Sequence, residues 1–106
     1  MMLYPRKLKD PEAALDYRFV WGEGRPGERV PGDVPWLEDG ETIASFTATA
    51  EAGLTLEWSD LVDEGGSVLV WLSGGTAGTD YEVKCHIITT SSRTDVRRMI
   101  VSVENR

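Results

Sequence analysis

The chain has 106 residues, enough for one domain with a single modest core, because a domain of this size buries less than about two-thirds of its unfolded surface. With 41% hydrophobic and 27% charged residues, the composition is that of a globular domain and argues against disorder along the whole length. The net charge of −7 repels phosphate backbones and anionic membranes, so we expect neither a nucleic-acid partner nor a membrane partner.

The N-terminal sequence and the cysteine content predict a soluble protein that is not exported. The N-terminus, MMLYPRKLKDPE, is charged within its first six positions and lacks the apolar region of a signal peptide. No apolar run approaches the roughly 20 residues that span a bilayer. The single cysteine, Cys85, cannot form an internal disulfide, which indicates synthesis in a reducing compartment.

The first segment, 1–14, is expected to be an N-terminal arm that contains one or two helical turns. Asp10 can cap such a helix and Pro11 can occupy its first position, ahead of an Ala-rich stretch. An arm of this kind can pair with a neighbouring protein or become ordered on binding. From residue 15 the pattern changes to period two, which predicts a first strand at 15–21 with one buried face.

The rest of the chain, 15–106, is expected to form a single β-sandwich domain. A stretch rich in Gly, Pro and charge at 22–35 predicts an exposed loop, because it cannot hold a regular ladder. Beyond this loop, β-branched residues, alternation and apolar runs predict further strands separated by Gly, Asp and Ser turns. These strands are expected at 42–50, 53–58, 67–73, 80–90 and 96–104.

The number and spacing of these strands predict the fold class. About seven short strands at roughly ten-residue spacing, without a long amphipathic helix, indicate an all-β fold. We expect an immunoglobulin-like β-sandwich of antiparallel strands. A small barrel is the alternative, because periodicity alone does not distinguish a closed sheet from two stacked sheets.

The Gly-rich stretch SGGTAG, which contains Gly74, Gly75 and Gly78, is predicted to be a tight corner between two strands. A phosphate-binding glycine loop needs a helix after it, so that free N–H groups face the anion, and here a strand follows. Tyr81 lies just after the corner. Its position resembles the tyrosine corner of Greek-key sandwiches, in which the hydroxyl bonds to nearby backbone.

No set of residues in the sequence is suited to catalysis, so we expect no enzymatic activity, no metal and no cofactor. Cys85 and His86 are adjacent in one strand and must point to opposite faces, so they cannot form a dyad. We expect Cys85 to pack as a small hydrophobic residue and His86 to face solvent. Two acidic turns lack the register of a calcium loop, and their carboxylates are predicted to be solvated. The residues concerned are Glu38, Asp39 and Glu41 in one turn and Asp60, Asp63 and Glu64 in the other.

The tryptophans divide into two groups by their phase in the strands. Trp21 and Trp58 share their phase with apolar neighbours and are expected in the core. Trp71 is out of phase with the valines beside it, so with Leu69 it belongs to the opposite face of its strand. Either the fold covers both faces of that strand, or Trp71 and Leu69 form an apolar patch that needs a partner.

Three arginines near the last hairpin, Arg93, Arg97 and Arg98, form a local basic cluster in an acidic protein. They are either a solvated turn or a set of contacts to carboxylates, for which arginine is favoured. An acidic body with such a cluster can assemble head to tail, which closes into a homo-oligomeric ring when the rotation allows. The candidate interface therefore comprises Leu69, Trp71, Gly74, Gly75, Gly78, Arg93, Arg97 and Arg98.

Three segments carry a resemblance to a known family: KDPEAALDYRFVW, WLEDGETIASFTATAEAGLT, and VWLSGGTAGTDYEVKCHIITTSSRTDVRRMIVSV. Together they resemble small structural proteins of tailed bacteriophages and prophages, of the fiber-tail adaptor type. The resemblance implies an immunoglobulin-like sandwich without enzymatic activity that serves as a virion part in or near the tail. It also implies tail, neck or fiber proteins as partners, and assembly in the bacterial host cytoplasm.

The chain departs from the family pattern in two places. The loop at 22–35 is an insertion before Trp36, and Ser92 stands where the family has a glycine before RTD. A turn residue that needs a positive φ favours glycine, so Ser92 is expected to change this turn. Two other functions remain open: a protein that decorates the head, and a module that binds carbohydrate or a host surface through Trp71 with Asp60 and Asp63.

Overall fold

The structure, a computed structural model, describes residues 6–22 and 36–104. Almost all of the loop predicted at 22–35 lies outside the described residues, as do 1–5 and 105–106. The described part contains seven strands and one short 3₁₀ helix. In chain order these are β1 (Arg6–Lys9), β2 (Leu15–Val20), β3 (Ile43–Ala50), β4 (Leu54–Val62), η1 (Asp63–Gly65), β5 (Ser67–Gly74), β6 (Thr79–Thr89) and β7 (Thr94–Val103).

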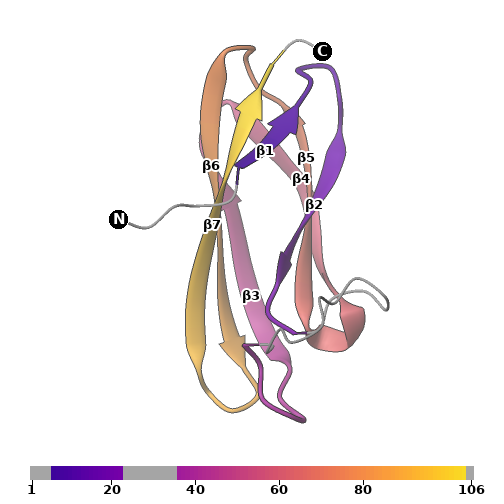
Figure 1. Ribbon diagram of the computed structural model, residues 1–106, viewed down its shortest axis with the longest axis vertical. Coiled ribbons are helices and arrows are strands. Elements are labelled where there is room, and N and C mark those ends of the chain that lie inside the picture. Colours follow the sequence, from indigo (N-terminus) through magenta and orange to yellow (C-terminus); the bar gives the residue numbers. More distant parts are fainter. Residues whose placement is uncertain (1–5, 23–35, 105–106) are drawn as a thin grey trace.

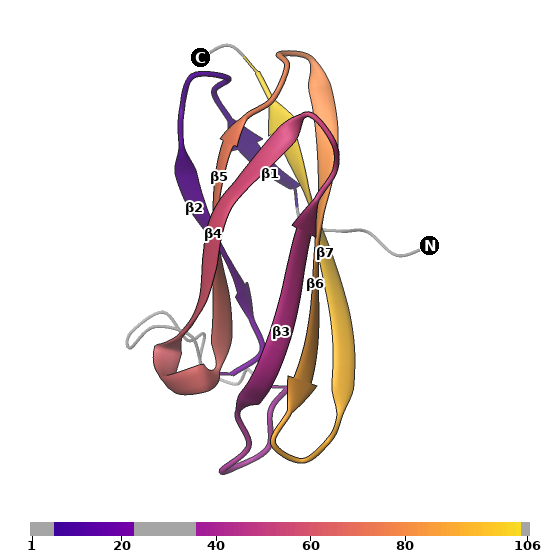
Figure 2. The same cartoon turned by 180° about the vertical axis from the view of Figure 1, so that it is seen from behind.

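Two sheets face each other and form a sandwich (Figures 1 and 2). The larger sheet has the order β1-β7-β6-β3, and the smaller one has the order β2-β5-β4. All neighbouring strands are antiparallel except β1 and β7. The predicted all-β sandwich is confirmed, and because the strands fall into two sheets, the barrel alternative is wrong. The immunoglobulin-like topology stays a prediction.

The core lies between the sheets and is made by alternate residues of the central strands. On β5 and β6 these residues are valines, a leucine, an isoleucine and Cys85, and β7 adds its last apolar positions. Trp21 closes one end of the core with 1% of its surface exposed, as its phase predicted. No helix in the described part of the chain is long and apolar enough to cross a membrane. The fully buried apolar side chains are Val68, Val70, Leu72, Val83, Cys85, Ile87, Val101 and Val103.

The N-terminal segment differs from the predicted arm. Residues Arg6–Lys9 form β1, which pairs with β7 in the parallel direction, so the sandwich begins before residue 15. The expected helix is absent from the described residues, and only one turn follows β1, closed by the Ala13 N–H donating to the Asp10 carbonyl at 3.1 Å. The segment RKLK is mostly charged and shows no apolar alternation, so its strand depends on the free backbone groups of β7.

Lys9 fixes β1 to the far end of the sandwich. Its side chain is fully buried, and its ammonium group donates to the carbonyl oxygens of Gly74 at 2.7 Å and Asp10 at 2.8 Å. Burial lowers the pKa of this lysine. The two carbonyl groups compensate for the water that the ammonium group loses. A charged residue in β1 thus acts as an internal link between the sheets.

The Gly-rich stretch is a corner between β5 and β6, as predicted. Gly75 has a φ of 94°, and a Cβ at this position would lie 2.6 Å from Cγ2 of Val103, so only glycine fits. The hydroxyl of Tyr81 accepts a hydrogen bond from the Thr76 N–H at 2.9 Å. This contact to nearby backbone is the one expected from the resemblance to a tyrosine corner.

Candidate functional site

The outer face of the smaller sheet carries a group of exposed aromatic and acidic side chains. Strand register places residues of β2, β5 and β4 side by side in rows across this face. One row contains Asp16, Trp71 and Trp58, and the next contains Arg18, Leu69 and Asp60. We call this surface the tryptophan face. Its residues are Asp16, Arg18, Val20, Thr55, Glu57, Trp58, Asp60, Val62, Leu69, Trp71 and Ser73.

Trp58 was expected in the core but lies on this face, so that expectation is wrong. The side chain is 48% exposed and is the most exposed of the large hydrophobic residues in the described part of the chain. The cause is an irregularity in β4: Leu56 pairs with Leu72 and Trp58 pairs with Trp71, which leaves Glu57 as an extra residue. Such a bulge reverses the alternation of the residues that follow it.

Trp58 and Trp71 stack on each other across β4 and β5. Their ring centroids are 5.7 Å apart and the ring planes differ by 8°. Trp71 and Leu69 lie on the outer face of β5, as the sequence predicted, and both are half-buried. Val20 and Val62 extend the apolar area two rows further, with Val20 39% exposed. Tryptophans in such positions are the residues that most often dominate the energy of protein interfaces.

The sequence carries one signal that could have located Trp58. Leu56 follows Leu54 by two positions, whereas Leu61, which also faces inward, follows Leu56 by five positions, an odd step. An odd step between inward-facing residues of one strand indicates a bulge between them. Regular alternation without a bulge instead places Trp58 in the core with Leu54 and Leu56.

The tryptophan face bears three carboxylates. Asp16, Glu57 and Asp60 are exposed, and Glu57 accepts a hydrogen bond from the Ser73 hydroxyl at 2.5 Å. The cation on the face is Arg18, whose guanidinium group lies 3.5 Å from the Asp63 carboxylate. Asp63 is half-buried in this ion pair, so it is not a solvated turn carboxylate as predicted.

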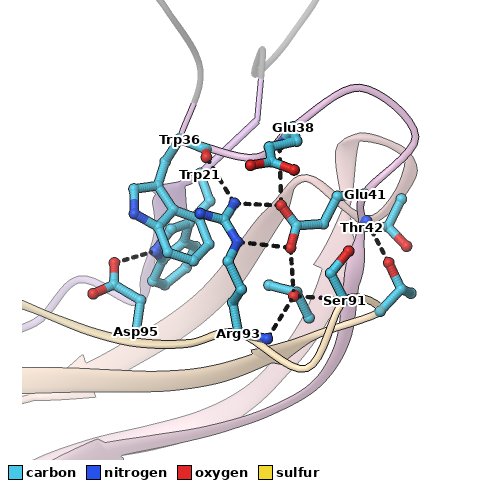
Figure 3. Close-up of polar contacts among 10 residues, drawn as sticks. Trp21, Trp36, Glu38, Glu41, Thr42, Ser91, Arg93 and Asp95 are labelled. Carbon is cyan, nitrogen blue, oxygen red and sulfur yellow. Dashed lines mark hydrogen bonds and ion pairs between the residues drawn. The ribbon is translucent and has the colours of Figure 1, made fainter.

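The first of the three arginines, Arg93, is half-buried in the turn between β6 and β7. Figure 3 shows its guanidinium group against the ring of Trp36, 4.0 Å from the ring centroid. Nε donates to Glu41 at 2.9 Å, and Nη2 donates both to the other carboxylate oxygen of Glu41 and to the Trp36 carbonyl at 3.0 Å. Arg93 is therefore a structural residue that joins the segment before β3 to the last hairpin.

Glu41 is buried, in contrast to the solvated carboxylate that was predicted. Besides Arg93, it accepts hydrogen bonds from the Thr89 hydroxyl at 2.6 Å and from the Glu38 N–H at 3.0 Å. These bonds, the one from Arg93 above all, lower the pKa of Glu41 to about 2. The bidentate pairing with Glu41 likewise raises the pKa of Arg93. Glu38 and Asp39 in the same turn are exposed, as expected.

Arg97 and Arg98 also have partners within the chain. Arg97 lies 5.0 Å from the ring centroid of Trp21, 3.4 Å from the Asp95 carboxylate, and donates to the Val20 carbonyl. Arg98 pairs with Glu82 at 3.2 Å on the outer face of the larger sheet. The two arginines point to opposite faces of β7, and neither joins Arg93 in a free basic patch. Gly74, Gly75 and Gly78 form the corner and lie outside the tryptophan face.

Cys85 and His86 are not arranged for catalysis. Cys85 is buried, and desolvation raises the pKa of its thiol to about 12, so the thiol carries no nucleophilic thiolate near neutral pH. His86 is half-buried and faces away from Cys85, on the outer side of the larger sheet. The described residues contain no cluster of histidine, cysteine and acidic side chains that could hold a metal ion.

Comparison with known protein families assigns the chain. A family model described as podophage GP4 fiber-tail adaptor protein gp77 matches residues 9–102, which is most of the chain. The chain belongs to this family. The matched range includes β2 to β7 almost completely, and therefore the whole tryptophan face and the Arg93 cluster. No curated protein matches the chain.

Proposed function

We propose that the protein is a non-enzymatic structural part of a bacteriophage virion, which joins tail and fiber or neck components through protein–protein contacts. Its membership of the fiber-tail adaptor family supports this role. The structural observation that supports it best is the stacked pair Trp58 and Trp71 on the outer face of the smaller sheet, in which the bulge in β4 leaves Trp58 48% exposed. A large apolar group kept in water at such a position marks an interaction surface.

The partners in this proposal are other virion proteins, and the site of action is the tail or neck of a particle that assembles in the host cytoplasm. Symmetric copies, such as a ring, remain part of the proposal because tail components are arranged around an axis. The three arginines from which head-to-tail contacts were predicted already form ion pairs with carboxylates of the same chain. Contacts between copies therefore need other residues than Arg93, Arg97 and Arg98.

Immunogold labelling of purified particles, with peptide counting of the same particles by mass spectrometry, tests this function. We expect label at the tail or neck and a copy number that fits a ring or a set of fibers. Label over the capsid would instead assign the protein to head decoration. Absence of the protein from particles would contradict a virion role altogether.

Carbohydrate binding is a second candidate, favoured by the same exposed tryptophans, since sugar rings stack on aromatic faces. Of the residues predicted to bind sugar, Asp63 is not available, because its carboxylate is paired with Arg18. Trp71, Trp58 and Asp60 remain. Binding to a glycan array that is lost in the variant Trp58→Ala would support this candidate, and binding unchanged in that variant would contradict it.

A further inference from the structure

The charges on the tryptophan face indicate what chemistry a partner must bring. The carboxylates of Asp16, Glu57 and Asp60 have no ion-pair partner within the described residues. Arg18 does not neutralise them, because Asp63 already matches its charge. The face therefore has a surplus of three negative charges around an aromatic pair. A complementary surface has to be cationic and must also cover apolar rings.

Strand register places the carboxylates next to the rings. Asp16 lies directly opposite Trp71 on one side, and Trp58 lies opposite Trp71 on the other. Asp60 follows Trp58 by two residues on the same side of β4, in the row of Leu69. Since adjacent strands are about 4.8 Å apart, one cationic side chain laid over Trp71 is within reach of Asp16.

Arginine satisfies both requirements with one group. Its planar guanidinium stacks on an indole ring and donates paired hydrogen bonds to a carboxylate at the same time. The protein itself contains this arrangement, because Arg93 lies 4.0 Å from the Trp36 ring centroid while it bonds to Glu41. The tryptophan face has an indole ring and a neighbouring carboxylate, as in the Trp36–Arg93–Glu41 arrangement. The arginine that would lie between them has to come from a partner.

The described part of a second copy, residues 6–22 and 36–104, is a poor source of that guanidinium. All the arginines that the structure describes already form ion pairs within the chain. Two tryptophan faces brought together would place their surplus carboxylates against each other, which is unfavourable. The paired arginines are Arg6, Arg18, Arg93, Arg97 and Arg98.

We propose that the tryptophan face docks an arginine-bearing surface of another virion protein, with the arginine stacked on the Trp58–Trp71 pair and bonded to Asp16 or Asp60. This inference rests on the proposed function and adds the chemistry of the partner and the residues that recognise it. The tryptophans supply the affinity, and the carboxylates supply orientation and specificity.

Co-sedimentation with particles assembled without this chain, and separately with purified fibers, tests the proposal. The full-length protein is added as wild type, as Trp58→Ala, and as the double variant Asp16→Asn, Asp60→Asn. The double variant Asp39→Asn, Glu104→Gln removes the same number of exposed carboxylates outside the tryptophan face and is the matched control. A thermal unfolding curve of each variant verifies that it is folded, which is expected because all the substituted residues are exposed.

We expect Trp58→Ala and the Asp16, Asp60 variant each to bind at least about tenfold more weakly than wild type, and the control to bind like wild type. Raising the salt from about 0.05 M to about 0.5 M should weaken wild-type binding and leave the Asp16, Asp60 variant almost unaffected, because the charge attraction is screened.

Other outcomes separate the inference from the proposed function. If wild type binds and the Asp16, Asp60 variant binds equally well, the partner is not cationic and the inference fails while the adaptor role stands. Binding to glycans, or a dimer of the free protein at pH 7, that is lost in Trp58→Ala would assign the face to another occupant and overturn the inference. If wild type binds neither particles nor fibers, both the adaptor role and the inference fail.

Discussion

Glu41 is the single residue whose protonation has the clearest consequence for stability. Its pKa is about 2 in the folded protein and near 4.5 without the surrounding structure, so the folded state favours the ionised form. The stabilisation is therefore complete above about pH 4.5 and is lost as the pH falls toward about 2. We expect the free energy of unfolding, measured by urea titration, to decrease across this range.

The variant Glu41→Gln isolates this contribution. It cannot gain a proton, so the decrease between about pH 4.5 and about 2 should become shallower, and the protein should already be less stable at pH 7 because Arg93 loses its charged partner. Asp39→Asn, in the same turn but exposed, is the control and should behave like wild type. An acid dependence that is equally steep in Glu41→Gln would contradict this assignment.

Ser92 stores backbone strain at the turn between β6 and β7. Its φ is 63°, a left-handed conformation that costs a residue with a Cβ about 1 kcal/mol or more. We expect Ser92→Gly to raise the free energy of unfolding by about 0.5 kcal/mol, because relief of this strain exceeds the added entropy of the unfolded chain. Ser91→Gly, at a neighbouring exposed position without positive φ, should lower it by about the same amount. Equal effects of the two substitutions, measured by urea unfolding, would show that strain is not the cause.

At the scale of elements, the bulge in β4 explains how one strand presents a tryptophan to solvent. Glu57 is the extra residue, so its deletion restores a regular strand in which Leu56 still faces Leu72 and Trp58 still faces Trp71. We expect the protein without Glu57 to fold with its stability changed by no more than about 1 kcal/mol. Its Trp58 should stay as accessible to oxidation by N-bromosuccinimide as in wild type.

Deletion of Ser59 is the matched comparison. It also removes the bulge, but Trp58 then takes the inward position opposite Val70 that the half-buried Ser59 occupies. Placing an indole in that space should cost about 3 kcal/mol or more. If the two deletions lower the stability equally, the bulge does not control the direction of Trp58.

Strands with clear apolar periodicity could be located from the sequence, whereas those that depend on tertiary pairing could not. The strands β2 to β7 lie close to their expected places because each has inward apolar residues at period two or an apolar run. The strand β1 has a charged sequence, so its pairing with β7 left no local signal. The candidate site was half found: Trp71 and Leu69 were assigned to the outer face, but the bulge concealed Trp58.

The arginines show a second limit of sequence patterns. Proximity in the chain suggested that Arg93, Arg97 and Arg98 form one cluster, but alternation along β7 sends Arg97 and Arg98 to opposite faces. The partners of Arg93 and Arg98, Glu41 and Glu82, come from other elements whose packing is not encoded in local spacing. Asp95, the partner of Arg97, lies two residues before it on β7 itself. In an acidic chain each arginine can be expected to pair with a carboxylate. Which carboxylate it pairs with is determined by the fold.

At the scale of the whole molecule, parts of the edges of both sheets carry features that hinder further strand pairing. β3 and β4 carry irregularities, and the half of β7 that β1 does not cover has two inward-pointing charged residues, Asp95 and Arg97. Arg97 also donates a hydrogen bond to the Val20 carbonyl oxygen at the end of β2, which is then not free to accept one from another strand. Bulges and inward charges are common devices against edge-to-edge association. These features favour the exposed faces over the edges of β3 and β4 as surfaces for assembly.

Net charge should control whether the free protein associates through these faces. At pH 7 the charge of −7 keeps copies apart, whereas near the isoelectric point of 4.6 the repulsion disappears. We expect sedimentation velocity to show monomers at pH 7 and reversible association near pH 4.6, where Glu41 is still ionised and the fold is intact. The variant Trp58→Lys should associate less, and association unchanged in this variant would exclude the tryptophan face.

The parallel pairing of β1 with β7 has a mechanical consequence. Four consecutive residue pairs, from Arg6 with Ile100 to Lys9 with Val103, join the first and last strands of the described chain. If force pulls the N-terminal end of β1 and the C-terminal end of β7 apart, the two strands must slide along each other, and their hydrogen bonds carry the load together instead of opening one after another. The buried ammonium group of Lys9 adds a further anchor against this sliding. A domain built this way resists stretching along its chain ends.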